Sequence, residues 1–297
     1  MYRTIMVPLD GSLFSEHALP LALQAARLSD AALHLVRVHD LDQQRIDTIT
    51  LDTQPENAYL ARIAERLAAN WHGPIQTMLL DGSAAEAIAA YAEHHRIDLV
   101  VMTTHGRGAL SRAWLGSVAD RLIRRLPMPM LLVRPHEADP ADLANPPRIG
   151  HLLIPLDGSE RSEQIIAPTI ALGRLTGATY TLLQAIAIFT PDYGIGIYTP
   201  TDFDITGWMK TAQQYLDRIA TDMRAEGLQV QTELVVGSPA ISILDYARDH
   251  AVDLIAIETH GYSGAARLIL GSVADKIVRG AGVPVLLHRP PDASSAP

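Results

Sequence analysis

The chain contains one six-residue stretch twice: Leu115-Gly116-Ser117-Val118-Ala119-Asp120, and the same six residues again at 270–275. A second stretch, residues 97–106, returns at 252–261 with the same spacing and ends both times on Thr-His-Gly. A third, Val7-Pro8-Leu9-Asp10-Gly11-Ser12, returns at 154–159 with Ile in place of Val, after a shorter interval. Three matches in the same order indicate a tandem duplication, with a short insertion in the second copy. The insertion falls in residues 189–204, where a surface loop is the first interpretation and a lid over a ligand the second.

Length and composition agree with two packed domains. The chain has 297 residues, and domains commonly hold about 100–200. With 48% hydrophobic and 19% charged residues, it has enough apolar material for two cores and does not have the composition of a disordered protein. We expect domain 1 over residues 1–135, a linker over 136–148, domain 2 over 149–290 and a tail over 291–297. Pro135, Pro140, Pro146 and Pro147 favour an extended linker.

Each copy alternates segments of strand and helix character. In the first copy, the patterns predict strands at 4–9, 32–38, 75–80, 99–102 and 130–133, and helices at 13–28, 55–71, 84–95 and 117–126. Thr53 and Glu56 are spaced for a capping box at the second helix. This alternation predicts an α/β fold: two tandem doubly wound domains, each a five-stranded parallel sheet flanked by helices. In such folds ligands bind beyond the carboxyl ends of strands, where the strand order reverses.

Several classes of protein are excluded by what the sequence lacks. There are no cysteines, so disulfides, thiolate metal sites and cysteine nucleophiles are excluded. The net charge of −9 argues against nucleic-acid binding. The sequence contains no run of about 18 apolar residues, so no membrane-spanning helix is predicted. The N-terminus shows no secretory signal, so a cytoplasmic location is expected. A Walker loop, a dinucleotide fingerprint and a nucleophile elbow are all absent, and Lys210 and Lys276 are the only lysines.

The repeated motifs follow the first and fourth strands, and each has two interpretations. Gly116-Ser117 opens a helix, whose first N–H groups and dipole favour a phosphate. However, Ser117 with Asp120 also fits a capping box, as does the second copy, and on local evidence capping is the better fit. Asp10 could accept from ribose hydroxyls or an exocyclic amine, or close its own turn, and local evidence favours neither. His105 and His260 have no evident nucleophile beside them, so a structural role is expected rather than catalysis.

These residues resemble the universal stress protein family in its tandem two-domain form. The family's nucleotide motif is Gly, two residues, Gly, nine residues, Gly, then Ser or Thr. The first copy supplies Gly106, nine residues, Gly116 and Ser117; the second supplies Gly261, nine residues, Gly271 and Ser272. The motif's first Gly is replaced by Thr103 in one copy and by Glu258 in the other.

The two replacements predict unequal sites. Thr103 narrows the approach of a ligand but adds a donor, whereas Glu258 places an anion near the phosphates and repels them. Arg107 of the first copy is also replaced, by Tyr262, which removes a partner for phosphate. We therefore expect domain 1 to be the better site.

The resemblance implies an adenine-nucleotide site in each domain, with ATP as ligand, with or without Mg²⁺. Adenosine and sugar would lie against the ends of the strands, and the phosphates against the glycines and the start of the last helix. In domain 1 the implied residues are Pro8, Leu9, Asp10, Val38, Met102, Thr103, Gly106, Gly116, Ser117, Val118 and Ala119. In domain 2 they are Pro155, Leu156, Asp157, Ala185, Ile257, Gly261, Gly271, Ser272, Val273 and Ala274. Family members pair through their last strands, so residues 130–133 would pair with 285–288 as an internal pseudo-dimer, and a further homodimer of chains is expected.

The leading hypothesis is a nucleotide-binding stress or signalling protein that acts through conformation or an unknown protein partner. No repeated pair of base and nucleophile is visible, so hydrolysis of ATP is expected to be slow at most. A second hypothesis is a scaffold of the same family that has lost nucleotide binding, which the replacements at Thr103 and Glu258 favour. A third, an adenylating enzyme of the wider adenine-nucleotide group, is opposed because Pro8-Leu9-Asp10-Gly11-Ser12 stands in place of that group's glycine-rich loop.

Overall fold

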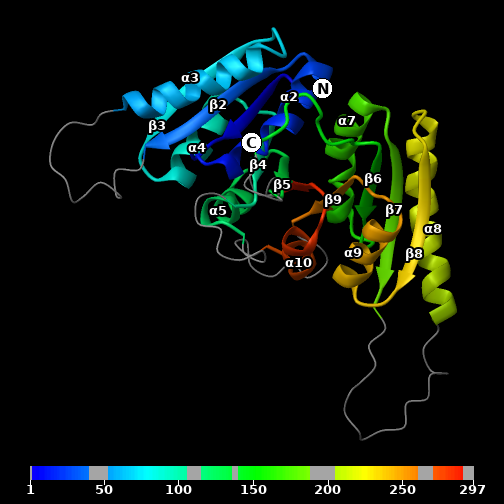
Figure 1. The fold of residues 1–297 in the computed structure, drawn as a ribbon. Coiled ribbons are helices and arrows are strands. Elements are labelled where there is room, and N and C mark those ends of the chain that lie inside the picture. The colour runs from blue at the N-terminus through cyan, green and yellow to red at the C-terminus, as the bar shows by residue number, and fades with distance from the viewer. Residues whose placement is uncertain are drawn as a thin grey trace, which may run out of the picture.

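The computed structural model describes residues 2–39, 53–105, 115–135, 140–187, 205–259 and 270–289 (Figure 1). Both halves of the chain alternate strands and helices, as the sequence predicts. Domain 1 contains β1 (Thr4–Pro8), α1 (Leu13–Glu16), α2 (Leu19–Ser29), β2 (Ala32–His39), α3 (Gln54–Ala68), β3 (Ile75–Asp81), α4 (Ala84–His94), β4 (Leu99–Thr103), α5 (Ser117–Arg125) and β5 (Met130–Val133). Domain 2 contains β6 (His151–Pro155), α6 (Glu160–Glu163), α7 (Ile166–Thr176), β7 (Thr179–Ile186), α8 (Ile205–Ala225), β8 (Val230–Val236), α9 (Pro239–Asp249), β9 (Leu254–Glu258), α10 (Ser272–Gly280) and β10 (Val285–His288).

The strands form one sheet that runs through both domains. Its order is β3-β2-β1-β4-β5-β10-β9-β6-β7-β8, with parallel pairs inside each domain. The domains meet where β5 pairs antiparallel with β10, and Leu131 lies opposite Leu286 in that register (Figure 1). Both side chains are fully buried, so the junction belongs to the interior of the protein. The predicted pairing of the two last strands, and with it the internal pseudo-dimer, is confirmed.

Helices cover both faces of the sheet, and each covering layer includes helices from both domains. On one face α2 and α3 share a hydrophobic core with α7 and α8; on the other α4 and α5 share one with α9 and α10. The strand β1 shows why its sequence is continuously apolar: Ile5 and Val7 point into the first core, Met6 into the second, and all three are fully buried. Each such side chain contributes about 1.5–3 kcal/mol by leaving water.

The helix predicted over residues 13–28 is two helices in the structure. After α1 the chain turns through His17 and Ala18, and α2 begins at Leu19. Pro20 explains the interruption: it has no N–H to continue the ladder and its ring would collide with the carbonyl four residues earlier. Because proline is tolerated in a first turn, the helix restarts with Pro20 there. The second copy is broken in the same way between α6 and α7, where Pro168 lies in the first turn of α7.

The predicted capping box of Thr53 and Glu56 is also wrong. Thr53 is the N-cap of α3, but its side chain makes no capping hydrogen bond. Glu56 instead accepts from His39 Nδ1 at 2.7 Å and lies 3.4 Å from Arg37 Nη2, both on β2. The carboxylate of Glu56 therefore bonds to side chains of β2, whereas its spacing from Thr53 predicted a bond within its own helix. The helix also ends earlier than predicted, at Ala68.

Candidate functional site

The repeated motifs meet at one edge of each half-sheet. In domain 1, β1 lies between β2 and β4, so the strand order reverses at its carboxyl end. Asp10 follows β1 there, and Thr104 and His105 follow β4. The start of α5 is tied to the same place, because the Gly116 N–H donates to the Thr104 carbonyl oxygen at 2.8 Å. Domain 2 repeats the arrangement, with the Gly271 N–H donating to Thr259 O at 2.8 Å.

Gly116 is favoured by the packing at this point. It is the N-cap of α5, in an extended conformation that any residue can adopt, with φ −61° and ψ 145°. A Cβ on Gly116 would lie 3.1 Å from the Thr104 carbonyl oxygen, closer than side-chain carbons normally approach. The glycine therefore lets the helix start against the end of β4. This reason holds whether or not a ligand binds.

The capping-box interpretation of the last helices is wrong in both domains. Ser117 is the first residue of α5, and within the part of the chain that the structure describes the N-caps Gly116 and Gly271 supply no capping side chain to α5 or α10. The carboxylate of Asp120 turns instead toward Arg124, one turn further on, with contacts of 2.7 and 2.9 Å. In α10, Asp275 pairs with Arg279 at 2.9 Å in the same way. An uncapped helix start concentrates N–H groups and positive partial charge, which suits an anion.

Asp10 and Asp157 close the turns after β1 and β6. Asp10 Oδ1 accepts from the Ser12 N–H at 2.9 Å and from the Ser12 hydroxyl at 2.6 Å. Asp157 makes the same two bonds with Ser159, at 3.0 and 2.6 Å. Each serine in turn caps the short helix that follows. The turn interpretation of these aspartates is therefore confirmed, and any contact with a sugar would be additional to it.

The residues at the exit of β4 bond to one another. The Thr103 hydroxyl donates to the His105 carbonyl oxygen at 2.8 Å, so the donor expected to face a ligand is used within the loop. The Thr104 hydroxyl lies 2.9 Å from His105 Nδ1 and positions the ring. Burial lowers the pKa of His105, and the charges of Arg134 and Arg279 lower it further. Both effects favour the neutral form of the His105 ring.

Glu258 makes the second domain different. Its carboxylate is almost fully buried; Oε2 lies 3.0 Å from His288 Nδ1, and Oε1 accepts from the Thr259 N–H at 3.1 Å. Burial raises the pKa of Glu258, against the opposing effects of His288 and the Thr259 N–H. In the matching register of domain 1, Thr103 lies beside Val133. The two domains thus differ by a buried acid–base pair at the motif's first position.

The structure places most of the other implied residues around these edges. Pro8 and Leu9 are buried at the end of β1, and Val38 is half-buried near the end of β2. The remaining apolar members belong to the second core or pack against it: Met102, Val118, Ala119, Ala185, Ile257, Val273 and Ala274. Pro155 and Leu156 are buried at the end of β6, while Ser117 and Ser272 are exposed. Gly106, Arg107, His260, Gly261, Tyr262 and residues 189–204 lie outside the described residues.

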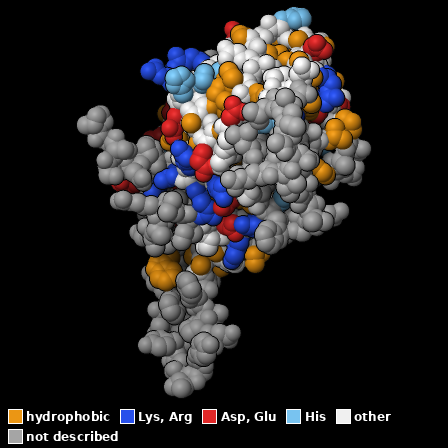
Figure 2. Space-filling model, turned by 90° about the vertical axis from the view of Figure 1, so that its left-hand side faces the viewer, with side chains coloured by type: hydrophobic (Ala, Val, Ile, Leu, Met, Phe, Trp, Pro, Cys, Tyr) orange, Lys and Arg blue, Asp and Glu red, His pale blue; other side chains and the backbone are white. Residues whose placement is uncertain are grey.

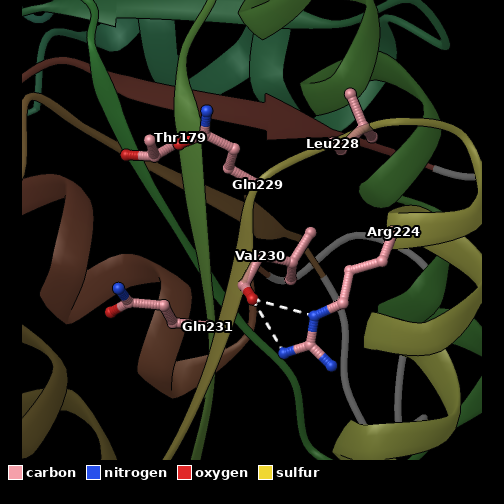
Figure 3. Close-up of a pocket in the computed structure, with 6 residues that line it drawn as sticks. All are labelled: Thr179, Arg224, Leu228, Gln229, Val230 and Gln231. Carbon is pink, nitrogen blue, oxygen red and sulfur yellow. Dashed lines mark hydrogen bonds between the residues drawn. The ribbon is translucent and has the colours of Figure 1, made fainter.

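A separate hollow of about 330 Å³ lies at the opposite edge of domain 2 (Figure 3). Thr179 and Val230 are the first residues of β7 and β8 and Gln229 precedes β8, so the hollow lies at the amino ends of these strands, whereas the motifs follow carboxyl ends. The guanidinium of Arg224 donates to the Val230 carbonyl oxygen at 2.8 and 3.1 Å, which holds the side chain against the strand. This hollow is therefore not the motif site.

Two further properties concern only the described residues. None of the helices there is both long enough and apolar enough to cross a bilayer. Within the same residues, no group of three or more histidine or carboxylate side chains is arranged to hold a metal ion.

Fold and site together define a class: a tandem doubly wound α/β protein in which a helix with a glycine N-cap begins at the switch point of each half. The universal stress protein family model matches residues 1–134 and 148–289, and the chain belongs to that family. A universal stress protein of Methanocaldococcus jannaschii is 31% identical over 141 residues, 45% of this chain and 83% of the relative. One of Mycobacterium tuberculosis (strain H37Rv) is 25% identical, over 99% of this chain and 97% of its own.

Solved structures agree on the fold. A universal stress protein from Archaeoglobus fulgidus superposes with a TM-score of 0.70 at 18% identity, over 97% of both chains. A putative universal stress protein from Pseudomonas aeruginosa gives 0.68 at 19% identity, over 97% of this chain and 94% of its own. The tandem arrangement of two such domains is thus shared along nearly the whole length.

Proposed function

We propose that this chain binds an adenine nucleotide, with ATP as the ligand to test first, and acts through binding rather than fast catalysis. The observation that carries the proposal is the start of α5. It lies at the switch point of domain 1, its N-cap is a glycine, no described side chain at the N-cap closes it, and Asp120 is turned away toward Arg124. A phosphate chain there would meet backbone N–H groups and the positive end of the helix dipole. The nucleotide motif of the family supports the same place.

We propose domain 1 as the better site. In domain 2 the buried carboxylate of Glu258 occupies the motif's first position. An ionised group there opposes a second anion, and it also fills space that a glycine would leave open. Thr103 of domain 1 is uncharged, and its hydroxyl is satisfied within the loop. One nucleotide per chain is therefore the expected stoichiometry.

The test is calorimetric titration of the whole chain with ATP and with adenosine. Ser117→Glu adds a carboxylate at an exposed position in the first turn of α5, where the helix dipole stabilises a negative charge, so the helix itself is retained. Two unit charges ~6 Å apart at an effective dielectric constant of ~20 repel by about 3 kcal/mol, so ATP affinity should fall at least tenfold. The matched control is Ser272→Glu in α10, which should leave ATP binding unchanged. Equal losses from both variants, or no binding by the parent at millimolar ATP, would refute the proposal.

A role for Mg²⁺ is part of the same proposal and has its own test. The titration is repeated with the magnesium salt of ATP and with excess chelator. A metal that bridges the phosphates would raise the affinity in the first condition, because it offsets phosphate charge. Equal affinities would restrict the proposal to the nucleotide alone.

The second candidate function is a scaffold that acts through protein partners without nucleotide. The buried pair of Glu258 with His288 favours it for domain 2, since that pair is complete without a ligand. Mass spectrometry of small molecules released from freshly purified protein separates the two candidates. An adenine nucleotide in the eluate supports the first, and its absence together with a flat ATP titration supports the scaffold.

The proposal extends to the organisation of the chain. We keep the boundaries at residues 1–135, 136–148 and 149–290, a homodimer of chains, and a cytoplasmic location as predictions. Limited proteolysis should cut first within 136–148, and light scattering should give twice the mass of 32.2 kDa.

A further inference from the structure

At the boundary between the domains, each domain contributes an arginine to the other. Arg134 follows β5 directly, and its Nη1 donates to the carbonyl oxygens of Arg279 at 3.2 Å and Ala281 at 3.3 Å, at the carboxyl end of α10. Arg289 follows β10, and its Nη1 donates to the Arg124 carbonyl oxygen at the end of α5. A cation at a helix carboxyl end meets its negative dipole end, so both arginines also fasten the domains together.

The antiparallel pairing of β5 with β10 determines what lies next to each site. It brings the carboxyl end of β5 beside the amino end of β10, and hence beside the last turn of α10. In domain 1, Thr103 is in register with Val133, and the Thr104 N–H donates to Val133 O at 3.0 Å. Arg134, the next residue, therefore projects from the same edge as His105 and the start of α5. The last turn of α10 in domain 2 thus borders the site of domain 1.

The charges of this boundary act on the site. The pKa of His105 is lowered by the positive charges of Arg134 and Arg279 in addition to burial. Arg279 is partly offset by Asp275, which contacts its Nε with both carboxylate oxygens at 2.9 Å. Figure 2 shows Arg and Lys side chains lying among Asp and Glu across the middle of the face it presents. Both arginines lower the proton affinity of His105, so each of them directs positive charge toward this edge of domain 1.

We propose that Arg134 and Arg279 are specificity-determining residues for the domain 1 site, which attract the anionic end of its ligand across the domain boundary. The inference rests on the proposed function and deepens it: the ligand is a nucleoside polyphosphate whose phosphate chain points toward α10. A neutral nucleoside gains nothing from these charges. Domain 2 therefore contributes to the site of domain 1 even though its own site carries Glu258.

Repetition of the sequence supplies a matched control. Arg289 and Arg124 occupy the positions that correspond to Arg134 and Arg279, and they border the site of domain 2. If the effect depends on which site the arginine borders, Arg134→Gln must weaken ligand binding in domain 1 and Arg289→Gln must not. Both substitutions remove interdomain hydrogen bonds to the carboxyl end of a helix, two for Arg134 and one for Arg289, so a loss caused by looser packing would be seen in both variants.

The experiment titrates the whole chain and its variants with ATP and with adenosine at low and high salt. We expect Arg134→Gln and Arg279→Gln each to lower the affinity for ATP about fivefold, and the double variant to lower it more than tenfold. The affinity for adenosine should be unchanged. Arg134→Lys, which keeps the charge, should retain most of the ATP affinity. The dependence of ATP affinity on salt should be shallower in the double variant than in the parent, because fewer charges are left to screen.

Each outcome is decisive. The inference would be overturned, with nucleotide binding itself left intact, by either of two results. One is that Arg134→Gln weakens the binding of ATP and of adenosine equally. The other is that Arg289→Gln weakens ATP binding as much as Arg134→Gln does. A parent chain that binds neither ATP nor adenosine would overturn the proposed function itself. An Arg134→Gln variant that matches the parent for both ligands would show that the boundary charges do not reach the ligand.

Discussion

The buried pair of Glu258 and His288 allows the strongest quantitative prediction. Their side chains are 2% and 15% exposed, and the contact between Oε2 and Nδ1 is 3.0 Å. Removing one partner of a buried pair leaves the other without compensation, which costs about 3–5 kcal/mol for a charged group. His288→Val should therefore destabilise the chain by about 3 kcal/mol at pH 8, the lower end of that range, because His288 retains some solvent contact.

The reverse change should cost less. Glu258→Thr leaves a histidine that can remain neutral, so the expected loss is about 1 kcal/mol. The double variant Glu258→Thr/His288→Val reproduces the pair Thr103 and Val133 that already packs in domain 1. The free energy of unfolding of this double variant should lie within about 1 kcal/mol of the parent's or above it, because uncharged replacements of buried ion pairs are often neutral or stabilising.

The assay is thermal unfolding followed by circular dichroism at pH 8 and pH 4.5. For a chain of this size a loss of about 3 kcal/mol lowers the melting temperature by roughly 6 °C. The pKa of Glu258 is raised in the folded state, so the folded protein holds its proton more tightly than the unfolded chain does. The stability associated with this proton is present at low pH and is lost as the pH rises through the raised pKa. The deficit of His288→Val should accordingly shrink at pH 4.5.

Two results would refute this reasoning. If Glu258→Thr costs as much as His288→Val, the carboxylate is a stabilising group rather than a charge that needs compensation. If the double variant loses the sum of the two single losses, the side chains are not coupled, and the contact contributes nothing specific.

Three further predictions concern other parts of the chain. Gly116→Ala should lower stability by about 1 kcal/mol without any nucleotide, because its Cβ meets Thr104 O at 3.1 Å and alanine is a poor N-cap; an unchanged melting temperature would contradict the close approach. Burial and the charge of His95 lower the pKa of His34, so the folded protein should lose stability as the pH falls below about 6.5. The variant His34→Thr, which copies Thr181 of domain 2, should flatten the dependence of stability on pH between pH 7 and 5. Parallel stability curves for the parent and the variant would contradict this prediction. The double variant at Glu258 and His288 should raise nucleotide stoichiometry from one toward two per chain by calorimetry, and no change would show that this pair is not what limits domain 2.

Sequence reasoning succeeded where the signal is local or repeated. Alternating strands and helices follow from hydrophobic periodicity, and the pseudo-dimer follows from the family resemblance. It failed where a side chain chose a partner from another element. Glu56 and Asp120 are both spaced for capping boxes, yet one bonds to β2 and the other to Arg124. The arginines at the domain boundary were missed, although Arg134 and Arg289 stand at matching places in the two copies, a signal that was available.

The amino-acid sequence by itself determined the duplication, the doubly wound fold of each half and the edge at which the motifs gather, because periodicity and repetition are written along the chain. Only the tertiary structure decided which groups share that edge. Glu258 meets His288 because β9 lies beside β10, and Arg134 reaches α10 because β5 and β10 run antiparallel. Contacts between distant residues depend on how the strands are ordered in space, and no local pattern encodes that order.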